Sequence, residues 1–113
     1  MNLEGITWQG QSVGNSFEAH FLPRPIDNLL QQINGFILWE GALHVRGVCI
    51  EPEWHSLQSA MDILEHYHVL EEGDVPFAQD CVGDQFIFRE NEIYRLLAET
   101  GELEKIADKL LSF

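Results

Sequence analysis

The sequence predicts a single α+β domain, residues 1–113, in which helices pack on a mainly antiparallel sheet. Apolar residues recur at helical spacing in three segments, short apolar or alternating runs lie between them, and brief turn sequences join the runs. Helices alternating with strands that are connected as hairpins indicate the α+β class. The length suits one hydrophobic core, and a hydrophobic content of 45% excludes disorder over most of the chain.

The N-terminal half is predicted to hold one helix and one hairpin. Residues 1–21 are mostly polar and suit an arm or a short strand. A helix is predicted over residues 25–34, with a proline in its first turn and a glycine after its end. Phe36–Trp39 is predicted to be a buried strand, Glu40-Gly41 a tight turn, and residues 43–48 the returning strand. The apolar face of this helix consists of Ile26, Leu29, Leu30 and Ile33.

The C-terminal half is predicted to hold two helices and three strands. One helix begins at Pro52, and a solvated turn follows at residues 71–74. Val75–Ala78 is predicted to be an edge strand, because proline cannot donate to a central ladder. Gln85–Arg89 and Glu92–Leu97 form a hairpin through Glu90-Asn91, and Thr100 caps a final helix. The two apolar helix faces are Leu57, Ala60, Met61, Leu64 and Tyr67 or His68, and then Leu103, Ile106, Ala107 and Leu110.

Several short motifs, in this order, resemble the SMI1/KNR4 (SUKH) superfamily. The first is Leu22-Pro23, followed by Leu29-Leu30 and Asn34-Gly35; the second is the run from Val75 to Phe86, which contains Val-Pro-Phe-Ala and Gly83-Asp84; Ile93-Tyr94 and residues 106–113 complete the set. The resemblance implies an α+β fold without known catalytic activity. Bacterial members commonly serve as immunity proteins that neutralise toxin domains, often nucleases, and other relatives act as adaptors. The sequence departs from the family in lacking an amphipathic helix before Leu22.

The charge of the chain indicates what kind of partner it accepts. Six basic and 19 acidic residues give a net charge of −13, and the residues from Glu51 onward contribute 15 acids and 4 bases, or −11. This field argues against nucleic acid and an anionic membrane as partners, and it indicates either a basic protein partner or high solubility alone. The sequence shows no signal-peptide n-region and no apolar run long enough to span a bilayer, so a cytoplasmic location is expected.

The residues that could support chemistry do not form a recognised site. His66 and His68 point to different sides of a helix, and no His-Glu-x-x-His or Cys-x-x-Cys motif is present. Cys49 and Cys81 are expected to be reduced, buried thiols, with a single disulfide between them as the alternative. Gly83 is expected to supply a turn with positive φ, and Asp84 to bond nearby backbone groups. We therefore expect no enzyme activity, no metal and no cofactor.

The acidic loops are the best binding candidates. If the strands form a meander, alternate turns share one end of the sheet, and some of these acids converge. Trp54, between two polar residues, is expected to be exposed and to anchor a partner, whereas Trp39 is expected in the core. The sequence thus predicts an immunity protein that occludes a basic toxin domain; a regulatory adaptor and, more distantly, a small metal-dependent enzyme are the alternatives. The candidate residues are Trp54, Glu71, Glu72, Asp74, Asp80, Asp84, Glu90 and Glu92.

Overall fold

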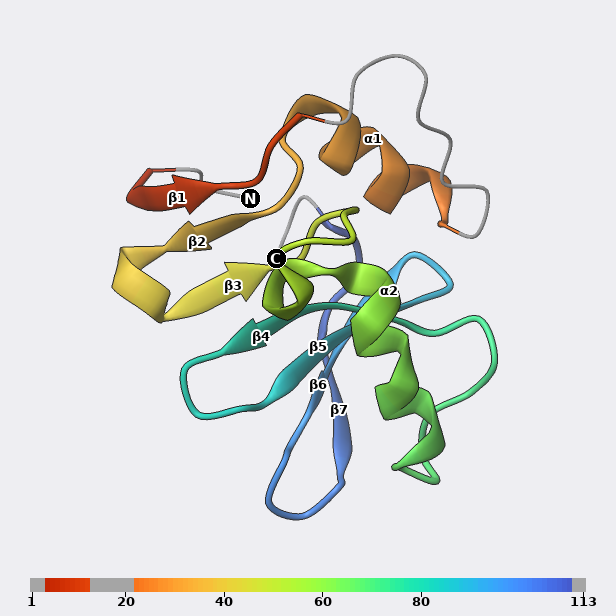
Figure 1. Ribbon diagram of the computed structural model, residues 1–113. Coiled ribbons are helices and arrows are strands. Elements are labelled where there is room, and N and C mark those ends of the chain that lie inside the picture. The colour runs from red at the N-terminus through yellow and green to blue at the C-terminus, as the bar shows by residue number, and fades with distance from the viewer. Residues whose placement is uncertain (1–3, 13–21, 111–113) are drawn as a thin grey trace.

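The structure, a computed structural model, describes residues 4–12 and 22–110. Within them, seven strands form one antiparallel sheet in which each strand pairs with the next along the chain (Figure 1). This arrangement confirms the predicted α+β class with an antiparallel sheet, and β1 and β7 are its edges. The strands are β1 Ile6–Gln9, β2 Phe36–Leu38, β3 Leu43–Val45, β4 Val75–Asp80, β5 Gln85–Arg89, β6 Glu92–Leu96 and β7 Leu103–Ala107.

The helix α1, Arg24–Gln32, lies close to its predicted position, and Pro25 occupies its first turn as expected. The helix predicted to begin at Pro52 is instead divided into three short pieces: η2 Glu53–His55, α2 Leu57–Ala60 and η3 Met61–Glu65. The backbone of Gly47 explains the interruption. Its N–H donates to the carbonyl of His55 (3.0 Å), and its carbonyl accepts from the N–H of Leu57 (2.8 Å). Residues 55–57 therefore bond to the end of β3 and cannot continue a helix.

The two faces of the sheet carry separate apolar clusters, because alternate residues of a strand point to opposite sides. On β5, Phe86 and Phe88 belong to a large cluster that also contains Ile26 and Leu30 of α1. Ile87, between them in sequence, belongs to a smaller cluster with residues of η3 and the loop after it. The sheet is thus covered by α1 on one face and by part of the connection between β3 and β4 on the other (Figure 1).

The prediction that Val75–Ala78 is an edge strand is wrong, because β4 lies in the middle of the sheet between β3 and β5. The missing N–H of Pro76 is accommodated because the pairing with β5 shifts register between Pro76 and Ala78. The carbonyl of Pro76 accepts a hydrogen bond from the buried Arg46 guanidinium at 2.7 Å. Proline is therefore tolerated at a local irregularity of a central strand.

The predicted final helix is wrong over residues 103–107, which form β7 along β6. Without β7, the outer backbone groups of β6 would form an unpaired edge, and pairing satisfies them. Thr100 accepts a hydrogen bond from the N–H of Glu102 (3.2 Å), so its hydroxyl supports a turn between strands instead of a helix start. Residues 111–113 of the predicted helix lie outside the described residues.

The prediction that Trp39 is a core residue is also wrong, since its side chain is 56% exposed. The strand β2 ends at Leu38, and Trp39 begins η1, Trp39–Gly41, with φ values of 50° at Trp39 and 56° at Glu40. The amide of Trp39 donates to the carbonyl of Gly5 (2.9 Å), which ties this turn to the start of β1. The predicted N-terminal strand is present as β1, and residues 1–3 and 13–21 are not described.

Candidate functional site

The acidic candidates divide between the two ends of the sheet, because successive turns of a meander alternate between its ends. Asp80 ends β4 and Asp84 precedes β5, so both lie at the turn between these strands. Glu90 lies in the turn between β5 and β6, at the opposite end. The acids at that opposite end are Glu71, Glu72, Asp74, Glu90 and Glu92, which precede β4 or adjoin the β5–β6 turn. The fold thus brings these acids together in two groups instead of one.

Asp74 has a structural role, since its side chain is almost fully buried, at 2% exposure. Its two carboxylate oxygens accept from Nε and Nη2 of Arg89 at 2.8 and 2.7 Å, and Oδ2 also accepts from the N–H of Glu71 (2.8 Å). Such a bidentate, charge-assisted pair fixes the loop before β4. The side chains of Glu71 and Glu72 remain exposed, although Glu71 lies 3.6 Å from Arg89.

Asp80 and Asp84 both bind Arg95 of β6, with oxygen–nitrogen distances of 2.6 and 3.0 Å. Asp84 also accepts from the N–H of Ala98, and this bond is the main reason that the pKa of its carboxyl lies below the usual value. Gly83 has φ of 92°, as expected for the turn. The predicted structural role of Gly83 and Asp84 is therefore confirmed.

The two remaining acidic candidates differ in their surroundings. Glu92 pairs with Lys105 of β7, whereas Glu90 is exposed in the β5–β6 turn. Arg89, Arg95 and Lys105 therefore form ion pairs with acidic residues of the protein itself. Charge available to a partner must come mainly from acids outside these pairs.

A second feature is the tryptophan patch, which we define as Trp8 of β1 and Trp54 of η2. Their ring centroids lie 5.0 Å apart with planes at 50°, and the Trp54 ring lies 5.4 Å from that of His44. Trp54 is 55% exposed, which agrees with its predicted exposure. Beneath the patch, the buried ring of His55 meets Trp8 edge to face at 4.6 Å. The exposed Trp54 indole and the half-buried Trp8 indole thus rest on a buried support.

The support under the tryptophan patch is a directed chain of hydrogen bonds. His55 Nε2 lies 2.8 Å from the carbonyl of Asn34 and must donate to it, so the other nitrogen, Nδ1, is an acceptor. His44 Nε2 lies 2.8 Å from that Nδ1 and donates to it, which leaves His44 Nδ1 to accept from Gln79 Nε2 at 3.4 Å. Gln85 in turn donates to Gln79. Both imidazoles are therefore neutral in a defined tautomer.

Burial and charge keep both imidazoles neutral. Burial is the largest cause and, together with His55 and the guanidinium of Arg46, lowers the pKa of His44 to about 4. Burial also lowers the pKa of His55, and its bond to the Asn34 carbonyl opposes this change. Neither ring is suited to act as a base on a substrate, since both nitrogens of each ring are occupied within the protein.

Three glycines enclose the His55 ring. A Cβ atom added at Gly10, Gly35 or Gly47 would lie 2.6, 2.6 or 2.5 Å from His55 Nε2, which is closer than real Cβ contacts. These positions come from the end of β1, the turn before β2 and the end of β3. Glycine is needed at each because the backbone approaches the imidazole so closely.

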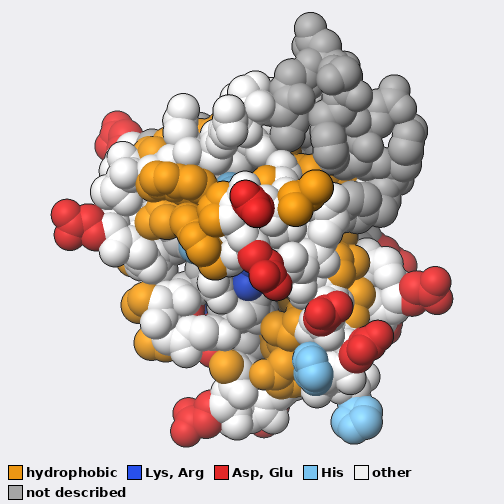
Figure 2. Space-filling model, in the orientation of Figure 1, with side chains coloured by type: hydrophobic (Ala, Val, Ile, Leu, Met, Phe, Trp, Pro, Cys, Tyr) orange, Lys and Arg blue, Asp and Glu red, His pale blue; other side chains and the backbone are white. Residues whose placement is uncertain are grey.

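The segment that carries Trp54 is strongly acidic. Residues 51–72 contain six acids and no lysine or arginine, and all six acids are exposed. Figure 2 shows a hydrophobic area over β1–β3 and, beside it, acidic side chains that continue along the course of α2 and η3. The acids of this segment are Glu51, Glu53, Asp62, Glu65, Glu71 and Glu72. The tryptophan patch therefore borders a continuous acidic segment.

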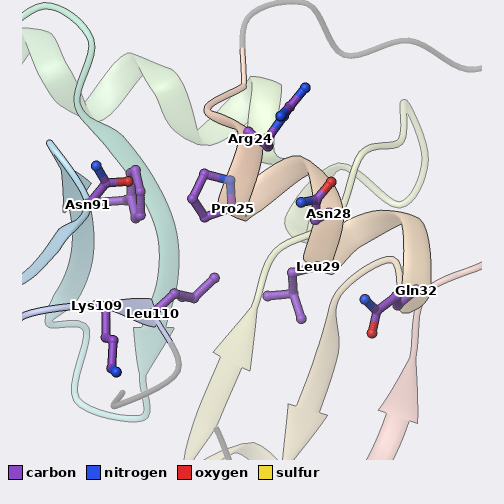
Figure 3. Close-up of a pocket in the computed structure, with 9 residues that line it drawn as sticks. Arg24, Pro25, Asn28, Leu29, Gln32, Asn91, Lys109 and Leu110 are labelled. Atoms are coloured by element: carbon purple, nitrogen blue, oxygen red, sulfur yellow. The ribbon is translucent and has the colours of Figure 1, made fainter.

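A pocket of about 610 Å³ lies between α1 and the end of the chain segment after β7 (Figure 3). Pro25, Leu29 and Leu110 point toward its middle, whereas Arg24 and Lys109 extend outward on different sides (Figure 3). The other lining residues are Asn28, Gln32, Phe88 and Asn91. Its lining residues include no carboxylate, imidazole, thiol or hydroxyl, and the amine of Lys109, the lining group that could act as a nucleophile or base, extends away from the middle of the pocket (Figure 3).

Metal-binding residues do not gather in the described part of the chain. No group of three or more His, Cys, Asp and Glu side chains there could hold an ion, and His66 and His68 are both exposed. The expectation of two buried thiols is wrong for Cys81, which is exposed, while Cys49 is half-buried; both are free. No helix among residues 4–12 and 22–110 is long and apolar enough to cross a bilayer.

Comparison of the chain with family models, with curated proteins and with solved structures found no match. The SMI1/KNR4 resemblance thus remains a prediction from motifs.

Sequence reasoning identified Trp54 but missed Trp8, His44 and His55. The hydrogen-bonded partners are separated by 21 residues for Asn34 and His55 and by 35 for His44 and Gln79. No linear pattern joins residues at such separations. The available signals were indirect: histidine at an alternating strand position, and glycine at three turns or strand ends.

Proposed function

We propose that this protein is a cytoplasmic immunity protein that binds a basic toxin domain and neutralises it by occlusion. One observation carries the proposal: the exposed Trp54, packed against the half-buried Trp8, borders a segment with six acids and no lysine or arginine. Tryptophan side chains are frequent energetic anchors of protein interfaces, and surrounding charges select a partner of opposite sign. The resemblance to the SMI1/KNR4 superfamily supports the same function.

The proposed mechanism needs no chemistry from this chain. A net charge of −13 attracts a basic surface over the Debye length and accelerates encounter. Desolvation of Trp54 and Trp8 then slows dissociation. If the basic surface is the part of a nuclease that binds nucleic acid, covering it prevents substrate from entering. Rigid support under the tryptophans limits the entropy that binding costs.

The test is co-expression with the product of the gene immediately upstream, followed by copurification and a growth measurement. We expect growth rescue and a stable complex. W54A should weaken both. W39A is the matched control, because Trp39 is equally exposed but lies in η1, between β2 and β3, and is not part of the tryptophan patch. Rescue without a complex, or a complex unaffected by W54A, would contradict occlusion through this surface. A complex without rescue would favour the adaptor function instead.

A further inference from the structure

The tryptophan patch has a shape and a charge environment that indicate which side chain a partner inserts there. Trp54 contacts Trp8 and His44 on its inner side and is 55% exposed on its outer side. More than half of this indole is therefore open to a partner, while its ring contacts hold it in place. Tryptophan is the best of the aromatic side chains at attracting a cation over its face.

The charges near Trp54 complement a cation. Glu51 and Glu53 lie within three residues of Trp54 and are exposed, and neither is paired with a basic side chain among the described contacts. Arg46 is the opposing charge on this side of the sheet, but its guanidinium is buried and bonded to the carbonyl of Pro76. The exposed surroundings of the indole are therefore anionic.

We propose that the tryptophan patch binds an arginine side chain of the partner, stacked on Trp54 with Glu51 or Glu53 accepting its N–H groups. This inference rests on the proposed function, since the arginine belongs to the basic partner. Arginine suits the site better than lysine, because its planar guanidinium stacks on an indole while its edge donates to carboxylates. Lysine carries the same charge, but its ammonium group is not planar and does not stack on an indole.

The test uses the full chain and short blocked peptides in which glycines separate arginines, lysines or uncharged citrullines. The readout is the NMR signal of each tryptophan indole N–H during titration. We expect the arginine peptide to shift the Trp54 and Trp8 signals and leave that of Trp39 unchanged. The lysine peptide should bind roughly fivefold more weakly, and the citrulline peptide more weakly still.

Variants separate stacking from charge. W54A should weaken arginine-peptide binding roughly fivefold or more, W54F should fall between W54A and the wild type, and W39A should not differ from the wild type. The double variant E51Q/E53Q should weaken binding and reduce its salt dependence. Thermal unfolding of each variant checks that the fold is retained.

Equal binding of arginine and lysine peptides, or equal shifts at Trp39 and Trp54, would overturn the inference. So would unchanged arginine-peptide binding by W54A. These outcomes are distinct from failure of the proposed function. Growth rescue without selective arginine binding overturns this inference alone, whereas selective arginine binding without rescue supports it and counts against the immunity role.

Discussion

Protonation of His44 is expected to destabilise the protein in a defined pH interval. Its folded-state pKa is about 4, compared with 6.5 for the unfolded chain, so the unfolded state takes up the proton first as pH falls. Stability from this group is thus fully present above pH 6.5 and is lost as pH falls toward 4. The charged and titratable groups around the ring are His55 and Arg46, and both oppose protonation of His44.

The size of the effect follows from the two pKa values. The full shift of about 2.5 units corresponds to about 3 kcal/mol, and linkage predicts a loss of about 2 kcal/mol between about pH 7 and pH 5. Protonation of carboxylates over the same interval also changes stability, so a reference variant is needed. H44Q retains an N–H that can donate to His55 Nδ1 but does not titrate.

The assay is urea denaturation of wild type and H44Q at both pH values, followed by tryptophan fluorescence. The wild type should lose about 2 kcal/mol more than H44Q between about pH 7 and pH 5, because other titrations cancel in the comparison. Equal losses would contradict a lowered pKa for His44 in the folded protein. They would mean that His44 titrates normally and that the directed hydrogen-bond chain does not hold it neutral.

Three further predictions concern packing, buried charge and association. G47A should destabilise the protein by about 3 kcal/mol, since the added Cβ meets His55 and the Asn34 carbonyl, whereas G73A, with open space around it, should cost about 1 kcal/mol; similar midpoints in urea would contradict the enclosure of His55. D74A should destabilise by about 3 kcal/mol by removing the buried, bidentate partner of Arg89, while E72A should change stability by less than about 0.5 kcal/mol; a D74A protein as stable as E72A would refute the buried pair. Association with the basic toxin domain, measured by stopped flow, should slow as salt rises, and a rate that does not change with salt would contradict electrostatic steering.

Local patterns predicted the elements whose contacts are local. The spacing of Ile26 and Leu30 predicted α1, and the alternation around Phe86 and Phe88 predicted β5 and its hairpin with β6. Such spacing and alternation can be recognised from residues that are close together in the sequence. The division of the acids between the two ends of the sheet follows from the same meander, once the strands have been assigned.

Long-range contacts decided the elements that the sequence did not predict. Leu103, Ile106, Ala107 and Leu110 satisfy a helical period, yet pairing with β6 makes residues 103–107 a strand. Asp74 looked like a solvated turn residue because its partner, Arg89, is 15 residues away. In each case the deciding partner lies on another element, and a single sequence does not reveal such a partner.

Hydrogen exchange of the complex with the toxin domain would show which surface of the protein the partner covers. Binding should protect the amides around Trp54, from Glu53 to Leu57, and those of β1 around Trp8. Amides of the turn at Glu90-Asn91, which lies at the opposite end of the sheet from the row that joins Trp8, His44 and Gln79, should exchange at their free rates. Protection confined to that turn, or to the pocket beside α1, would contradict binding through the tryptophan patch.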